Sequence, residues 1–148
     1  MGRYIELPQI NDKATKKSVE LALYQYRNFM ITLPMDMMPK VTPSYSLVPP
    51  SNTNGFHSST EDVAIERMEY EEKRNAFMNE IHEAVNTLKE KERAIIIKKY
   101  MEDGIGYDPD IYSEIGVGKT KYYILKGEAM LRLAFALKIE VYKGKKEA

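Results

Sequence analysis

The strongest constraint on the fold is the segment 108–133, DPDIYSEIGVGKTKYYILKGEAMLRL, in which glycines separate two helical patterns. Asp108 can cap a helix with Pro109 in its first turn, because a proline there loses no helical hydrogen bond. Gly116 can end this helix in a left-handed conformation. From Lys119 onward the three-to-four spacing of apolar residues predicts a second, longer helix. The residues of its buried face are Tyr122, Leu125, Ala129, Met130, Leu133 and Leu137.

A short helix, a turn and a longer helix form the layout of a helix-turn-helix, in which the second helix enters the major groove of DNA. Polar side chains near the start of that helix, away from its buried face, are therefore the candidate contacts to double-stranded DNA. The expected base-reading residues are Thr120, Lys121 and Tyr123, and the expected phosphate contacts are Lys119, Lys126 and Arg132.

The same segment contains part of a nucleotide-binding motif. Gly118, Lys119 and Thr120 match the end of the phosphate-binding loop G-x-x-x-x-G-K-[ST], but the position of its first glycine is Ser113. The motif also requires a buried strand before the loop, whereas the preceding residues have a helical pattern. We therefore expect no nucleotide site and no enzymatic activity.

The formal net charge of the chain is zero, but the charge is unevenly distributed. Residues 118–148 contain eight Lys and Arg and three Glu, a net charge of +5, whereas residues 61–83 contain three basic and eight acidic residues, a net charge of −5. This asymmetry fits a basic end that faces DNA and an acidic end held away from phosphates. The alternative is that both segments are solvated helix faces.

Composition excludes several other classes of protein. The chain has 148 residues and no cysteine, and its two histidines, His57 and His82, are far apart, so we expect no disulfide framework, no metal site and no cofactor. The first ten residues lack an apolar signal core, and no run approaches the roughly 18 to 20 apolar residues of a membrane span. The expected location is the cytoplasm of a bacterial host cell, in association with the nucleoid.

The N-terminal part, 1–33, is expected to form one amphipathic helix over residues 13–31 that Asp12 caps. Its apolar face comprises Val19, Ala22, Leu23, Tyr26, Phe29 and Met30. Lys13, Lys16 and Lys17 lie in its first turns, where positive charge opposes the helix dipole slightly. They are either solvated surface residues, which is the simpler interpretation, or phosphate contacts.

Residues 34–60 contain five of the seven prolines, which exclude a continuous helix and predict an irregular linker or extended arm. Several residues of the arm are too apolar for a solvated tether, so part of it is expected to pack within the chain, against a second copy, or on another partner. These residues are Met37, Met38, Val41, Tyr45, Leu47, Val48 and Phe56.

Residues 61–88 are expected to form a charged connecting helix, capped by Ser58, Ser59 or Thr60 and running to about Thr87. Its late apolar face comprises Phe77, Ile81, Ala84, Val85 and Leu88, while its first half should be exposed or pair with another subunit. Residues 89–148 form the proposed DNA-binding domain, which starts with a break at 88–92 and a helix over 93–101. In that helix Ile96, Ile97 and Tyr100 should face inward. The predicted fold class is all-α.

The segment 86–138 resembles region 4 of sigma-70-type factors. The resemblance depends on the Glu92-Arg93 pair before an apolar helix, on Glu114-Ile115-Gly116 before the turn, and on the closing Ala129 and Leu133. It implies that the DNA-facing positions are Lys119, Thr120, Lys121, Tyr123 and Ile124, with Lys126 near the backbone.

The chain departs from the sigma pattern at two of these positions. Sigma factors place arginine and glutamate at several of them, and arginine can make a bidentate pair with guanine. Tyr123 and Ile124 instead favour apolar contact with thymine methyl groups or a different site. The chain also has no segment like the promoter-melting region 2, so an independent sigma factor is not expected.

Nearly the full length also resembles the ArpU family of phage and prophage transcriptional regulators, named for autolysin regulation. The resemblance includes the N-terminal segment LPQINDKATKK and the central segment YSLVPPSNT. It implies a regulator of late phage genes for packaging and lysis. Two other interpretations stay open, a sigma-like accessory factor that docks on RNA polymerase and a phage DNA-packaging or assembly component. The composition permits a homodimer but contains no long heptad run.

Overall fold

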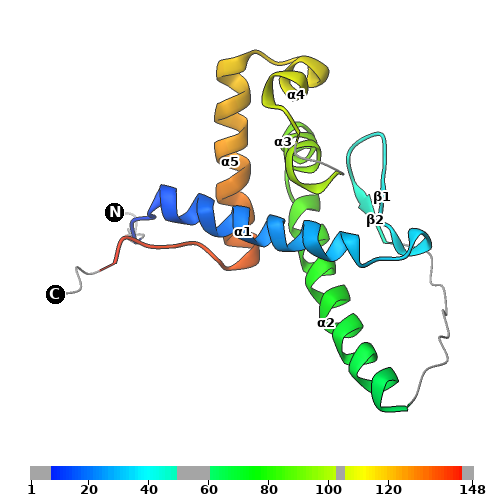
Figure 1. Cartoon of the computed structure of the whole chain (residues 1–148). Helices are drawn as coiled ribbons and strands as arrows, with labels where there is room; N and C mark the ends of the chain where they lie inside the picture. Colours follow the sequence, from blue (N-terminus) through cyan, green and yellow to red (C-terminus); the bar gives the residue numbers. More distant parts are fainter. Residues whose placement is uncertain (1–7, 50–60, 103–105, 145–148) are drawn as a thin grey trace, which may run out of the picture.

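The structure, a computed structural model, describes residues 8–49, 61–102 and 106–144 and is mostly helical, which confirms the predicted all-α class (Figure 1). None of the helices in these ranges combines the length and apolar character needed to cross a membrane. The elements in chain order are α1 (Asp12–Ile31), a 3₁₀ turn (Met35–Met37), β1 (Lys40–Val41), β2 (Leu47–Val48), α2 (Glu61–Asn86), α3 (Glu90–Ile96), a π-helical turn (Ile97–Met101), α4 (Asp108–Ile115) and α5 (Lys119–Leu137).

Helix α1 begins at Asp12, one residue earlier than predicted. Asn11 is the N-cap, and its Oδ1 accepts a hydrogen bond of 3.1 Å from the backbone N–H of Ala14. The prediction that Asp12 caps this helix is wrong, because the preceding side chain satisfies the unpaired N–H and leaves Asp12 in the first turn. The predicted buried face is correct, since Val19, Leu23 and Tyr26 are buried.

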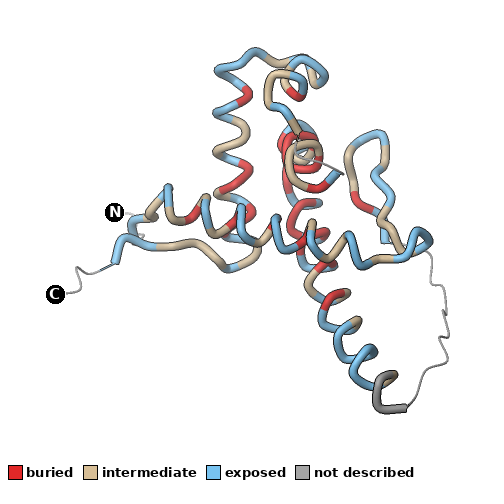
Figure 2. Tube along the Cα trace, viewed as in Figure 1, coloured by how far each residue is buried: buried red, intermediate tan, exposed pale blue. Residues whose placement is uncertain are grey.

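The main hydrophobic core lies where α1 crosses α2 and α5 (Figure 1). It draws on six elements, among them the π-helical turn with Ile97 and Met101, and its buried residues are concentrated at the crossings, as Figure 2 shows. The core includes Val19, Leu23 and Tyr26 of α1, Leu47 of β2, Met78, Ile81, Ala84 and Val85 of α2, Ile96 of α3, and Ala129, Met130, Leu133 and Ala134 of α5.

Helix α3 lies between this core and a smaller one. Ile95 packs with Ile111 and Tyr122 in the smaller cluster, whereas Ile96 and Ile97 belong to the main core. One side of a regular helix cannot bury three successive residues, so burial of all three requires partners on two sides. The predicted α-helix over 93–101 is wrong in its second part, where the backbone widens into the π-helical turn.

Part of the proline-rich arm forms a β-hairpin, which the predicted linker did not include. Strand β1 pairs antiparallel with β2, with Val41 opposite Leu47. The backbone of Leu47 donates to and accepts from the side-chain amide of Asn86, at 2.9 and 3.1 Å. Arg93 donates to the carbonyl oxygens of Ser44 and Tyr45 at 2.8 and 3.2 Å. The prediction that part of the arm packs within the chain is confirmed, while Phe56 and the predicted caps Ser58, Ser59 and Thr60 lie outside the described residues.

The two ends of the described chain are tied together beside α1. Ile10 and Tyr142 form an antiparallel bridge, and the backbone N–H of Asn11 donates to the carbonyl oxygen of Val141 at 2.8 Å. The buried hydroxyl of Thr15 donates to this carbonyl at 3.1 Å and accepts from the backbone N–H of Val141 at 2.9 Å. These contacts hold the first turns of α1 against the segment that follows α5.

The first half of α2 extends away from the core (Figures 1 and 2). Its described side chains, from 64 to 73, are exposed or half-buried, whereas Met78, Ile81 and Val85 in the second half are buried. The predicted division of this helix into a charged, exposed half and an apolar, buried half is confirmed.

Candidate nucleic-acid interface

The turn between α4 and α5 has the geometry expected for its glycines. Gly116 has a φ of 75° and a ψ of 35°, the left-handed conformation that favours glycine. The backbone N–H of Val117 donates to the carbonyl oxygen of Tyr112 at 3.0 Å, which closes the end of α4. Helix α5 then begins at Lys119, as predicted. Because α4 occupies the positions where the phosphate-binding motif requires a buried strand before the loop, the described residues do not form that motif.

A small hydrophobic cluster fixes α4 against the first half of α5. Ile95 of α3, Ile111 of α4 and Tyr122 of α5 are its buried members. The ring of Tyr112 meets that of Tyr122 edge to face, with 5.5 Å between the centroids. Helices α3 and α4 therefore hold the N-terminal half of α5 in one orientation.

The outer side of that half presents most of the predicted contact residues to solvent. Lys119, Thr120 and Lys121 are exposed, and Tyr123 and Ile124 expose 44% and 57% of their surface. Within the described residues neither Lys119 nor Lys121 forms an ion pair. The structure thus brings these five residues together on two adjacent helical turns.

Lys126 and Arg132 are placed differently from the other five. The Lys126 ammonium lies 3.5 Å from a carboxylate oxygen of Asp108, and its side chain is mostly covered. Arg132 is half-exposed, and its guanidinium lies 3.5 Å from a carboxylate oxygen of the fully buried Glu92 on α3. Both cations therefore also connect α5 to its neighbours.

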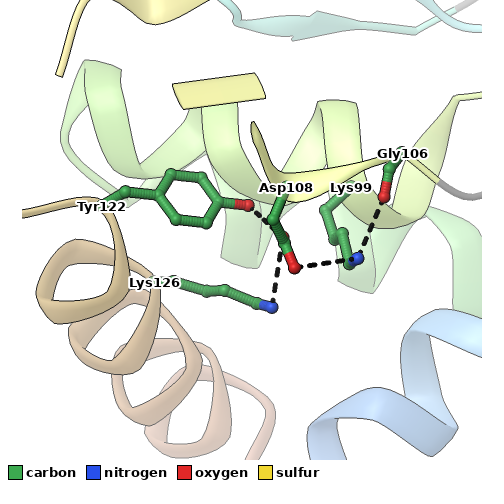
Figure 3. A network of polar contacts seen from close by, with 5 residues as sticks. All are labelled: Lys99, Gly106, Asp108, Tyr122 and Lys126. Carbon is green, nitrogen blue, oxygen red and sulfur yellow. Dashed lines mark hydrogen bonds and ion pairs between the residues drawn. The ribbon is translucent and has the colours of Figure 1, made fainter. Parts of the chain in front are cut away.

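Asp108 is the centre of a polar network that joins three elements (Figure 3). Its carboxylate accepts a hydrogen bond from the Tyr122 hydroxyl and lies 3.3 Å from the Lys99 ammonium as well as 3.5 Å from Lys126. Lys99 also donates to the carbonyl oxygen of Gly106 at 2.9 Å. This network connects the first residue of α4 to the π-helical turn after α3 and to α5.

The environment of Asp108 keeps it ionised. Burial alone would raise its pKa, but the hydrogen bond from Tyr122 and the charges of Lys126 and Lys99 outweigh burial and hold the pKa below its usual value. Burial and the nearby Asp108 raise the pKa of Tyr122, so its hydroxyl stays a donor.

The predicted capping role of Asp108 is wrong. Asp108 is the first residue of α4, Tyr107 is the N-cap, and no side chain in the described part of the chain caps this helix. The carboxylate turns toward Lys99 and Tyr122 instead. The sequence could not indicate this network, because its members are separated by up to 27 positions along the chain.

Sequence reasoning also did not identify the contact between α1 and the middle of α5. The Nζ of Lys16 lies beside Gly127, and a cavity of about 290 Å³ opens between the two helices there. The cavity is lined by Lys16 and Glu20 of α1, by Tyr123 and Lys126 of α5, and by Tyr100. One of the predicted base readers, Tyr123, therefore stands between the outer face of α5 and this cavity.

Relatives that match nearly the whole chain come from Listeria and one of its phages. An uncharacterized phage-related protein of Listeria innocua, Lin1259/Lin1739, is 37% identical over 143 residues, which cover 97% of this chain and 100% of the relative. The chain belongs to this family of phage-related proteins. Within the same family, protein Gp66 of Listeria phage A118 is 27% identical over 144 residues, which cover 95% of this chain and 99% of that protein.

No protein-family model matches the chain, and no solved structure matches it. The predicted phage or prophage origin is confirmed by the phage-related relatives. Membership of the ArpU family and the regulation of transcription stay predictions.

Proposed function

We propose that this phage-related protein is a sequence-specific transcriptional regulator that binds double-stranded DNA through a helix-turn-helix formed by α4 and α5. The observation that carries the proposal is the outer face of α5. Two cations that form no ion pair with the described residues, a hydroxyl, a tyrosine and an isoleucine lie together there, and a packed cluster supports them from behind.

The side chains on this face suit the two parts of DNA recognition. Lys119 lies at the first residue of α5, where its charge would meet a phosphate at the edge of the groove. Thr120, Lys121 and Tyr123 would reach base edges, with Lys121 suited to the acceptors of guanine. Ile124, more than half exposed, would contact a thymine methyl group.

Lys126 and Arg132 would also contact phosphates, but as cations that are already paired with acidic residues of the protein. Each remains paired with an acidic residue inside the protein, so its direction is fixed before DNA arrives. A cation held in this way loses little side-chain entropy on binding but carries less uncompensated charge than Lys119 or Lys121.

The phage-related family and the resemblances to the ArpU regulators and to sigma region 4 support a role at late phage genes, for packaging and lysis. In this proposal the protein binds DNA without catalysing a reaction and without a resident cofactor. RNA polymerase is a second proposed partner, which a regulator of this type could contact while bound to DNA.

The test is selection of bound duplexes from a random pool by the purified full chain, followed by salt titration of the selected duplex. We expect one defined motif, with an affinity that falls steeply as salt rises, because lysine contacts displace counterions from DNA. A symmetric motif would indicate binding as a dimer. Failure to enrich any sequence would contradict the proposal and favour a polymerase-docking or assembly role.

A further inference from the structure

Lys16 of α1 lies against α5, with its side chain partly buried. A β-carbon placed on Gly127 of α5 would lie 3.4 Å from the Lys16 Nζ, so the missing side chain of Gly127 leaves space for the lysine. Lys16 is half-buried, and within the described part of the chain it forms no ion pair. A cation partly removed from water without a partner is poised to accept one.

The place of Lys16 on the side of α1 that faces α5 is fixed by its neighbours in the helix. The adjacent Thr15 is fully buried and forms two hydrogen bonds with the backbone of Val141. Four residues on, Val19 is fully buried in the main core. Helix α1 therefore cannot turn about its axis without breaking these contacts, and the backbone of Lys16 stays on the side of α1 that faces α5.

The cavity between α1 and α5, hereafter the α1–α5 groove, offers polar groups suited to a phosphate. Lys16 and Lys126 supply two positive charges, of which Lys126 is shared with Asp108. Tyr100 and Tyr123 also line the groove. Burial raises the pKa of Tyr100, so its hydroxyl stays protonated and able to donate.

The distance along α5 between Lys119 and the α1–α5 groove matches the width of the major groove of DNA. Gly127 follows Lys119 by eight residues, a rise of roughly 12 Å along the helix. The major groove is about 12 Å wide between its two phosphate backbones. If the first residues of α5 approach the phosphates at one edge of the major groove, its third turn therefore reaches the phosphates at the other edge.

We propose that the α1–α5 groove binds a backbone phosphate of the DNA duplex that α5 reads, with Lys16 as the principal cation. The inference rests on the proposed function and assigns α1, outside the helix-turn-helix, a direct part in holding the duplex. Glu20 lines the same groove, one helical turn after Lys16, and opposes the phosphate. It would limit affinity for DNA of any sequence and so favour dissociation from non-specific sites.

These opposed charges give two variants with opposite expected effects. Lys16→Ala should weaken binding on the order of three- to ten-fold and make the slope of log affinity against log salt shallower by about 0.9, the value for one phosphate contact. Glu20→Gln should strengthen binding by a similar factor. Both changes should be equal on the selected duplex and on a scrambled duplex of the same length, because phosphate contacts are independent of sequence.

The experiment measures the affinity of the full chain for both duplexes by fluorescence anisotropy at several salt concentrations. Lys40→Ala, in the hairpin, is the matched control for Lys16→Ala, and Glu80→Gln, on α2, is the matched control for Glu20→Gln, because both residues are exposed. The gain expected for Glu20→Gln cannot come from misfolding. If the Lys16 and Glu20 variants behave as their controls, the inference is wrong although the proposed function stands. If the unmodified chain binds neither duplex, the proposed function fails and the inference fails with it.

Discussion

The first half of α2 is acidic and the first half of α5 is basic, and the protein supports the two differently. In α5, Tyr122 is fully buried between Ile95 and Ile111 within the first turns of the helix, and Asp108 ties this region to two further elements. In α2, the described side chains before Arg74 are exposed or half-buried, and the ring of Tyr70, itself 44% exposed, meets that of Phe29 at 6.1 Å between ring centroids.

Charge alone does not make a recognition surface. The acidic half of α2 and the basic half of α5 have opposite net charge, yet only the latter is held by a packed cluster that fixes the direction of its side chains. Reading a sequence requires such fixed geometry, because base edges are distinguished by donors and acceptors at defined positions.

The largest difference between the two regions should appear in stability. Ile111→Ala, in the cluster behind α5, should lower the free energy of unfolding by about 2–5 kcal/mol. Ile111 is 4% exposed, so truncation of its side chain leaves a buried cavity. Ile65→Ala, in the first half of α2, should change it by less than about 0.5 kcal/mol, because Ile65 is 49% exposed. Urea unfolding followed by circular dichroism measures both. Equal losses would contradict the packing contrast.

DNA binding should separate the two regions next. Lys121→Ala and Tyr123→Ala should each cost roughly 1–3 kcal/mol of binding free energy on the selected duplex and much less on a scrambled one. Lys73→Ala, an exposed lysine of α2, removes the same charge and should leave both affinities nearly unchanged. The assignment of α5 would fail if Lys121→Ala and Lys73→Ala gave the same result.

The buried half of α2 should respond to pH in a way that its exposed half does not. His82 packs against Tyr26, with 2.6 Å between its Nε2 and the tyrosine hydroxyl, and burial lowers the pKa of His82 to about 4. Between this value and the ordinary pKa near 6.5, the unfolded chain binds a proton that the folded chain does not, so stability should fall as pH falls from about 6.5 to about 4.

This pH dependence can be measured by urea unfolding at several pH values. His82→Gln keeps a polar side chain at this position and should remove the part of the dependence between pH 4 and 6.5. An unchanged profile in His82→Gln would show that other groups cause the loss.

The smallest expected effect lies at the boundary of the proposed interface. Gly127 lies in the interior of α5 and has an ordinary helical backbone with a negative φ, which alanine also adopts. Gly127→Ala should raise the free energy of unfolding by about 0.5–1 kcal/mol, because alanine loses less backbone entropy and its β-carbon would contact the flexible end of Lys16 without a clash. Thermal unfolding measures this change, and a lower melting temperature would show that the two helices are packed more tightly than the structure indicates.

The features that the sequence predicted correctly are those that local residues determine. The left-handed Gly116, the start of α5 at Lys119 and the buried face through Tyr122 and Leu133 each follow from side chains a few positions apart. The exposed positions of Lys119, Thr120, Lys121, Tyr123 and Ile124 follow from the same spacing.

The features that it did not predict depend on residues far apart in the chain. The hairpin at 40–48 is held by Asn86 and Arg93, about 40 to 50 positions away. Asp108 turns from capping α4 because Lys99 and Tyr122 lie within reach only in the folded chain. The place of Lys16 against α5 likewise requires the crossing of α1 and α5, which no local pattern contains.

Methylation interference on the selected duplex shows whether α5 reads the major groove. Methylation of guanine N7 adds a group in the major groove, whereas methylation of adenine N3 adds one in the minor groove. We predict that N7 methylation within the selected motif blocks binding and that the pattern changes at one or two base pairs in Lys121→Ala. Interference confined to adenine N3, or none in either groove, would contradict the account.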